Sequence, residues 1–235
     1  MIKHLITGGC SFSADNFCWP RHLAKQLNVT HDQTGVGSSD NSLISRKVIQ
    51  AVHQKMSQGI DPSDICVGIM WSGPTRKSFY INDPQRLKLA QPYDSETSPH
   101  SWPTSLDKWV LIGSGFRSRL AQGWFKTYQH DIQDQIETYE HMLRVQWFLK
   151  SHNIKYFYTT FLDSVLEDPN GSEHLVGHLK HMIDWDKFLP VTSMAGWCHK
   201  KYPTHFPAPP DEHPGDFQHN RFAAEVIIPW LQRNA

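Results

Sequence analysis

Short apolar runs along the chain alternate with segments in which apolar residues recur at helical intervals. The runs at 4–7, 64–71 and 155–162 are rich in β-forming side chains and predict strands. The run at 64–71 is almost continuously apolar, which is typical of a strand covered on both faces. It is therefore the best candidate for the centre of a sheet.

Segments with apolar residues three and four positions apart predict helices. These segments cover 19–27, 43–56, 132–149, 173–183 and 216–231. Ser39, Asp40 or Asn41 can cap the second of them. Because strands and helices alternate, the sequence predicts right-handed βαβ units and an α/β fold with a mostly parallel central sheet.

Two long segments, about 72–126 and 163–210, interrupt this alternation with prolines, glycines and scattered aromatic residues. They are too long to be idle connections and are interpreted as insertions. Their tryptophans and tyrosines could stack on sugar rings, or could pack the insertions onto the sheet. A chain of 235 residues falls within the single-domain range, so one domain over 1–235 is expected.

Composition narrows the classes of function. Lysine plus arginine equals aspartate plus glutamate at 23 each, so no overall charge attracts nucleic acid or an anionic membrane. The first apolar stretch is too short for a signal peptide and no run has transmembrane length, so a cytoplasmic protein is expected. The four cysteines form no Cys-x-x-Cys pair and are expected to be reduced thiols. A small, locally polar substrate fits this composition best.

One histidine cluster has a spacing that suits a metal. His174, His178 and His181 would share one face of the predicted helix at 173–183. No carboxylate or cysteine partner is evident in sequence, so a solvated, histidine-rich face is the favoured interpretation.

Three loops carry candidate chemistry, because ligands of parallel α/β sheets bind at the carboxyl ends of strands. After the first strand, the glycines at 8 and 9 allow a sharp turn that can lift Ser11 out of the path of the chain. The segment 35–41 offers backbone N–H groups at a helix start, where negative charge is stabilised. It lacks the third glycine of a dinucleotide fingerprint and the Gly-Lys-Ser/Thr of a phosphate loop.

The third loop lies near the C-terminus, where His213 follows Asp211 by two residues and precedes Pro214. A carboxylate at this spacing can orient the imidazole, which can then accept the proton of a serine hydroxyl. Taken singly, each loop also has an ordinary interpretation as a capped turn or a chance neighbour. Their order along the chain is what distinguishes them.

In order and position, these loops resemble the sequence blocks of the SGNH hydrolases, the GDSL-type esterases and lipases. That family has a Gly-Asp-Ser motif after its first strand, an oxyanion glycine after the second, an asparagine after the third, and Asp-x-x-His before the last helix. The segment Gly9-Cys10-Ser11 is similar to the first block, Gly37 to the second, and His213-Pro214 to the last. The resemblance spans nearly the whole chain and implies a three-layer α/β/α, flavodoxin-like fold.

The resemblance also implies a function. Ser11 would be the nucleophile of a serine esterase, His213 its general base, and Asp211 the residue that orients the imidazole. The N–H groups of Ser11 and Gly37 would stabilise the oxyanion. An O-acetyl group of a carbohydrate, or another small acyl ester, is the expected substrate, with no metal or organic cofactor.

Two departures concern the nucleophile and the oxyanion hole. Cys10 replaces the aspartate of the first block and is itself an alternative nucleophile. The segment 69–76 has no asparagine, so Ser72 or Arg76 would have to supply the third oxyanion donor, although a surface ion pair also explains Arg76.

A third departure concerns the acid. Asp211 precedes His213 by two residues instead of three, which leaves Asp163 as a second candidate for orienting the ring. The alternative function is a non-catalytic binding module that holds a glycan or a protein partner in the same cleft.

Overall fold

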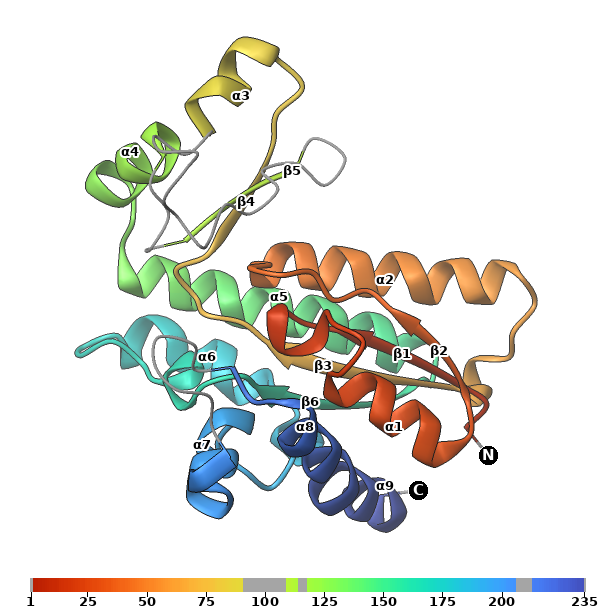
Figure 1. Ribbon diagram of the computed structural model, residues 1–235. Helices are drawn as coiled ribbons and strands as arrows, with labels where there is room; N and C mark the ends of the chain where they lie inside the picture. Colours follow the sequence, from red (N-terminus) through yellow and green to blue (C-terminus); the bar gives the residue numbers. More distant parts are fainter. Residues whose placement is uncertain (1, 91–108, 114–117, 206–212, 235) are drawn as a thin grey trace.

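A parallel sheet forms the centre of the molecule (Figure 1). The computed structural model describes residues 2–90, 109–113, 118–205 and 213–234. Four strands pair in the order β2-β1-β3-β6, and every pairing between them is parallel. They are β1 (His4–Gly8), β2 (Thr30–Gln33), β3 (Ile65–Trp71) and β6 (Lys155–Thr160). The predicted α/β fold with a mostly parallel sheet is confirmed.

Helices cover both faces of this sheet (Figure 1). They are α1 (Trp19–Leu27), α2 (Asn41–Ser57), α5 (Asp131–Ser151), α6 (Glu173–Met182), α7 (Met194–Lys201), α8 (Asp216–Phe222) and α9 (Ile228–Arg233). In β6 the side chains alternate between the two layers. The ring of Phe157 packs on Trp19 of α1 and Trp230 of α9, whereas the hydroxyl of Tyr158 donates to the carbonyl of Met142 in α5. Because successive strand residues face opposite sides, one strand holds both layers in place.

Single-turn 3₁₀ helices connect several of these elements. They are η1 (Ser11–Ser13), η2 (Pro62–Asp64), η3 (Asp163–Leu166), η4 (Trp185–Lys187) and η5 (Pro203–His205). Of the three capping candidates for α2, Asp40 is the cap, since its side chain accepts a 2.9 Å hydrogen bond from the N–H of Leu43.

The predicted C-terminal helix contains a π-helical turn (Ala223–Ile227) between α8 and α9. Pro229, at the start of α9, has no N–H and cannot complete the regular α-helical hydrogen bond to residue 225. A local change to π-type bonding is one way in which a helix continues past such an interruption.

The first insertion has regular structure that the sequence pattern did not predict. Its strands β4 (Lys77–Tyr80) and β5 (Trp109–Ile112) pair antiparallel, and α3 (Pro84–Ala90) and α4 (Arg119–Thr127) belong to the same region. A small separate core joins Val110 and Ile112 to Ala121. The expectation of an irregular surface insertion was therefore wrong here, because strands of four residues far apart in sequence produce no detectable periodicity.

Several compositional expectations can be compared with the structure. The four cysteines are free, as predicted, and the structure buries all of them. His174, His178 and His181 are exposed on α6. Within the described residues, no helix is long and apolar enough to cross a membrane.

Candidate active site

Ser11 and His213 meet at the carboxyl edge of the sheet, although 202 residues separate them in sequence. The Oγ atom of Ser11 lies 2.8 Å from Nε2 of His213. Ser11 begins η1, directly after β1, and His213 precedes α8. A serine hydroxyl within hydrogen-bonding distance of an imidazole is the arrangement that a nucleophile and its general base require.

A sharp turn presents Ser11 at this edge. Gly9 has a φ of 157°, and a Cβ atom there would collide with the side chain of Ser13 and lie 3.1 Å from the carbonyl oxygen of Met70. Only glycine fits this position without displacing its neighbours. The side chain of Cys10 is fully buried in the hydrophobic core, whereas Ser11 is partly exposed. The turn therefore directs Ser11, and not Cys10, toward His213.

Aromatic rings pack beside the imidazole of His213. The ring of Phe12 lies 4.9 Å from that of His213 and 5.3 Å from that of Phe161, which follows β6. These contacts limit the positions that the imidazole can occupy.

Trp19, the first residue of α1, is hydrogen-bonded to both halves of the site. Its indole N–H donates to Oγ of Ser13 at 3.0 Å, in the turn that carries Ser11. Its backbone N–H donates to Nδ1 of His219 at 3.1 Å, in the helix that follows His213. A single buried residue thus connects the two loops that the sequence places at opposite ends of the chain.

His219 is buried and neutral. Burial, together with the nearby His22 and His213, lowers its pKa to about 3, although a hydrogen bond with the backbone of Pro214 opposes the shift. Because Nδ1 accepts the N–H of Trp19, the single proton of the neutral ring lies on Nε2. His219 therefore connects α1 to the residue that follows His213.

A hydrogen bond joins the turn before Ser11 to the loop that contains Gly37. The N–H of Val36 donates to the carbonyl of Gly9 at 3.1 Å, which places the loop that contains Gly37 against the turn before Ser11. Ser38 adopts a left-handed φ of 60° in this loop. Within the described residues, the N–H groups of Ser11 and Gly37 donate to no protein acceptor.

Asn41 fixes the segment that follows β3. In the SGNH hydrolases, an asparagine stands in the corresponding segment. Oδ1 of Asn41 accepts the N–H of Ser72 at 2.8 Å and its Nδ2 donates to the carbonyl of Ser72 at 3.0 Å and to Thr138 Oγ1 at 3.2 Å. Ser72 is fully buried, and its Oγ accepts a 2.8 Å hydrogen bond from Nη1 of Arg76.

The guanidinium of Arg76 lies over the ring of Phe161, 5.0 Å from its centre. Among the described residues, no carboxylate pairs with Arg76. The interpretation of Arg76 as part of a surface ion pair therefore finds no support among the described residues.

Asp211 and Asp163 were the two candidates for the carboxylate that orients the imidazole of His213. Asp211 lies outside the described residues. The carboxylate of Asp163 lies against α7, because a Cβ atom on Gly196 would be 2.6 Å from its Oδ1. Gly196 is in the first turn of that helix, where a negative charge is favourable, so this placement favours a structural role for Asp163.

Comparisons with known proteins place the chain in a family. The model of a family of unknown function, DUF6071, matches residues 6–189. The chain belongs to this family. The matched segment includes Ser11, Gly37, Ser72 and Arg76 and ends before His213.

The other two comparisons searched curated proteins and solved structures. No curated protein matches the chain. Among solved structures, the chain is similar to a member of the lipolytic protein G-D-S-L family from Veillonella parvula DSM 2008, with 10% identity, 94% of each chain covered and a TM-score of 0.45.

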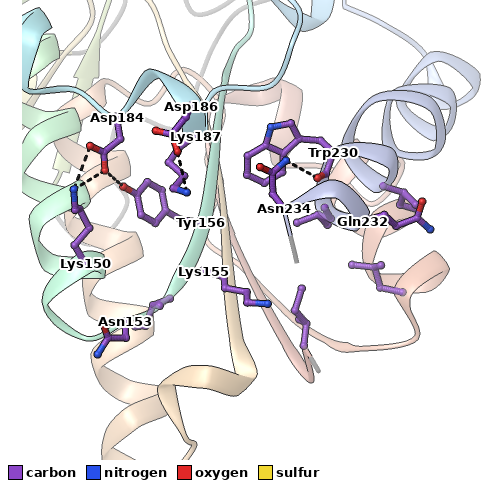
Figure 2. A pocket seen from close by; sticks show the side chains of 15 residues that line it. Lys150, Asn153, Lys155, Tyr156, Asp184, Asp186, Lys187, Trp230, Gln232 and Asn234 are labelled. Carbon is purple, nitrogen blue, oxygen red and sulfur yellow. Dashed lines mark hydrogen bonds and ion pairs between the residues drawn. The ribbon is translucent and has the colours of Figure 1, made fainter.

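A cavity of about 740 Å³ in this DUF6071 member lies at the opposite edge of the sheet (Figure 2). Lys155, the first residue of β6, lines it. Nζ of Lys150 lies 2.8 Å from Asp184, and the hydroxyl of Tyr156 donates to the same carboxylate, also at 2.8 Å. Lys150 and Asp184 therefore neutralise one another, and none of the residues that line the cavity belongs to the Ser11–His213 arrangement.

The sequence analysis did not identify three residues that support the Ser11–His213 site. Asn41 was considered only as a helix cap, and neither Trp19 nor His219 was assigned a role. Asn41 could have been noticed because it is a second polar residue directly after Asp40 at the start of a predicted helix. For Trp19 and His219 the signal was weak, because a contact between positions 200 residues apart leaves no pattern in a single sequence.

Proposed function

We propose that this protein is a serine hydrolase that cleaves a small acyl ester, such as an O-acetyl group of a carbohydrate, through an acyl-enzyme on Ser11. The observation that carries the proposal is the 2.8 Å contact between Ser11 Oγ and His213 Nε2. It joins a nucleophile to a base at the edge of the sheet where α/β proteins bind their ligands.

The reaction proceeds in two halves. Ser11 Oγ attacks the acyl carbonyl carbon while His213 Nε2 accepts the hydroxyl proton. The protonated His213 then donates this proton to the leaving alkoxide, and the acyl group remains on Ser11 as an ester. His213 next accepts a proton from water, whose oxygen attacks the acyl carbon. The bond between that carbon and Ser11 Oγ then breaks, His213 returns the proton to Oγ, and the acid is released. Asp211 is the proposed orienting group for the imidazole.

The charge that develops on the carbonyl oxygen needs hydrogen-bond donors. The unoccupied N–H groups of Ser11 and Gly37 are the proposed pair, because they belong to loops held together by the Val36–Gly9 hydrogen bond. Ser72 and Arg76 are the candidates for a third donor.

A fluorophosphonate probe tests the nucleophile directly, since it phosphonylates an activated serine. Wild type should be labelled on the peptide that contains Ser11, and Ser11→Ala should not be labelled. His213→Gln should react more slowly, because the hydroxyl loses its base. Turnover of 4-nitrophenyl acetate should follow the same order.

Cys10→Ala is the matched control for the neighbouring thiol. It should retain labelling and turnover, because Cys10 lies in the core and not against His213. The proposal fails if folded wild type is neither labelled nor active on the acetate. That outcome would favour the alternative of a binding module for a glycan or protein partner.

A further inference from the structure

Arg76 is a cation that follows β3 at the edge of the sheet where Ser11 and His213 meet, and no carboxylate among the described residues pairs with it. Its neighbour in sequence, Lys77, is paired with Asp134 at 2.7 Å and with Glu137 at 2.5 Å, so those two carboxylates are already neutralised. The guanidinium of Arg76 itself is partly buried.

Arg76 is held in position by a hydrogen bond and a ring contact. Nη1 donates to the buried Ser72 Oγ at 2.8 Å, and the guanidinium plane is supported by the ring of Phe161. Asn41 in turn holds the backbone of Ser72 on both its N–H and its carbonyl. This side chain is therefore ordered before any ligand arrives, which lowers the entropic cost of binding to it.

The bond to Ser72 leaves one edge of the guanidinium unused. Nε and Nη2 donate to no acceptor within the described residues, and their N–H bonds point the same way along that edge. Two parallel donors match the two oxygens of a carboxylate, which is the bidentate pairing that arginine forms best.

The location of Arg76 connects this edge to the reaction centre. Phe161, under the guanidinium, contacts the ring of Phe12, and Phe12 contacts His213. The register of the sheet pairs Gly8 with Ile69, so the turn that carries Ser11 and the segment that begins at Ser72 leave neighbouring strands at the same level.

We propose that Arg76 binds a carboxylate on the substrate, so that the substrate class is an ester carrying a carboxylate in its acyl or alcohol part. The inference rests on the proposed hydrolase function and gives Arg76 the role of a specificity determinant instead of a third oxyanion donor. The two roles have different consequences. An oxyanion donor raises the rate of hydrolysis of every ester, whereas a carboxylate-binding residue raises only that of anionic esters.

Matched pairs of esters test the inference by activity. One pair is 4-acetoxybenzoate and its methyl ester, with the charge on the alcohol side. The other is the 4-nitrophenyl monoester of succinate and its methyl ester, with the charge on the acyl side. Wild type should prefer the anionic member of at least one pair by about tenfold or more in kcat/KM.

The Arg76→Gln variant should lose that preference, because its rate on the anionic ester falls at least about tenfold more than its rate on the neutral ester. Arg76→Lys should recover only part of the preference, because it keeps the charge and loses the paired donors. Arg233→Gln, an exposed arginine in α9, is the control for removal of one positive charge. Equal loss on neutral and anionic esters would overturn the inference, as would the absence of any preference in wild type.

A binding experiment separates this inference from the hydrolase proposal. In the Ser11→Ala background, calorimetry with 4-acetamidobenzoate and its methyl ester measures recognition without turnover. The acid should bind about tenfold more tightly than the ester, and Arg76→Gln should remove the difference. Equal affinities would refute the Arg76 role whether or not wild type hydrolyses esters. Selective binding without hydrolysis would refute only the hydrolase.

Discussion

The backbone N–H of Trp19 donates to Nδ1 of His219 at 3.1 Å, a contact between the start of α1 and the helix that follows the candidate base. Since the indole of the same residue donates to Ser13, Trp19 joins the loops of Ser11 and His213. The distance between Ser11 and His213 therefore depends on a buried residue that forms no hydrogen bond with either of them. Such a residue acts by positioning.

Replacing His219 with leucine should misplace His213, because the Trp19 N–H loses its acceptor and the backbone of Pro214 loses its hydrogen bond. We expect kcat to fall by about ten- to a hundredfold with KM little changed, since the substrate-binding groups remain. Rates per active site, counted by fluorophosphonate titration, check this.

Two conservative variants separate positioning from general stability. His219→Asn keeps an acceptor near the Nδ1 position, and His219→Gln keeps a donor near the Nε2 position. Each should recover part of the rate. If all three variants show wild-type kcat per titrated site, His219 is structural only.

Three buried or partly buried histidines make folding sensitive to acid. Burial lowers the pKa of His31 and of His141 from 6.5 to about 4, and that of His219 to about 3. Because these folded-state pKa values lie below the unfolded value, the unfolded chain takes up protons first as the pH falls. Their stabilising contribution is complete above pH 6.5 and is lost as the pH falls toward the folded values.

The free energy of unfolding, measured in urea from about pH 7.5 to about pH 4.5, should therefore decrease on the acid side, by at most about 1.4 kcal/mol per pH unit for each histidine. His31→Gln should reduce this slope, and the exposed His174→Gln is the control for loss of one histidine. A flat profile below pH 6.5 would show that these rings are not held neutral.

The strongest periodic segments were predictable, and the short polar ones were not. Leu23, Ala24 and Leu27 set the helical pattern of α1, whose bounds agree with the prediction. The edge strand β2 has the sequence Thr-His-Asp-Gln and was missed, because no apolar alternation marks it. The helix α7 was missed for the same reason, since its eight residues show no clear apolar repeat.

The residues of the candidate site also differ in how well the sequence predicts them. Ser11 and His213 were predictable because glycines and a proline mark their loops and because these loops follow a known order. The bonds of Asn41 to Ser72 were not, since they join residues that are 31 positions apart and whose roles depend on how the loops pack. The local sequence pattern therefore identifies candidate reactive side chains, whereas the packing of the folded chain determines which residues they contact.

Asn41 should be important for stability as well as for the site. Asn41→Leu keeps the side-chain size but leaves the N–H and carbonyl of the buried Ser72 without partners. Each unsatisfied group costs about 1–3 kcal/mol, so we expect a loss of at least about 2 kcal/mol in urea unfolding. Asn170→Leu, at an exposed position, should change stability by less than about 0.5 kcal/mol. Equal stabilities of the two variants would contradict this role.

Lys77, the first residue of β4, connects the two-stranded β4–β5 sheet to α5 through a nearly buried ion pair. Its Nζ lies 2.7 Å from Asp134, whose side chain is 2% exposed, and 2.5 Å from Glu137. Lys77→Met would leave the charge of Asp134 buried without its cation, which typically costs about 3–5 kcal/mol. Urea unfolding of the variant at neutral pH measures this loss.

The double variant Lys77→Met with Asp134→Asn tests the cause of that loss. Neutralising Asp134 removes the uncompensated charge, so the double variant should be more stable than Lys77→Met alone. Lys3→Met removes a partner from the exposed pair with Asp64 and should reduce stability far less than Lys77→Met, because water screens that pair. If Asp134→Asn adds a further loss instead of a recovery, the cost of Lys77→Met comes from packing and not from charge.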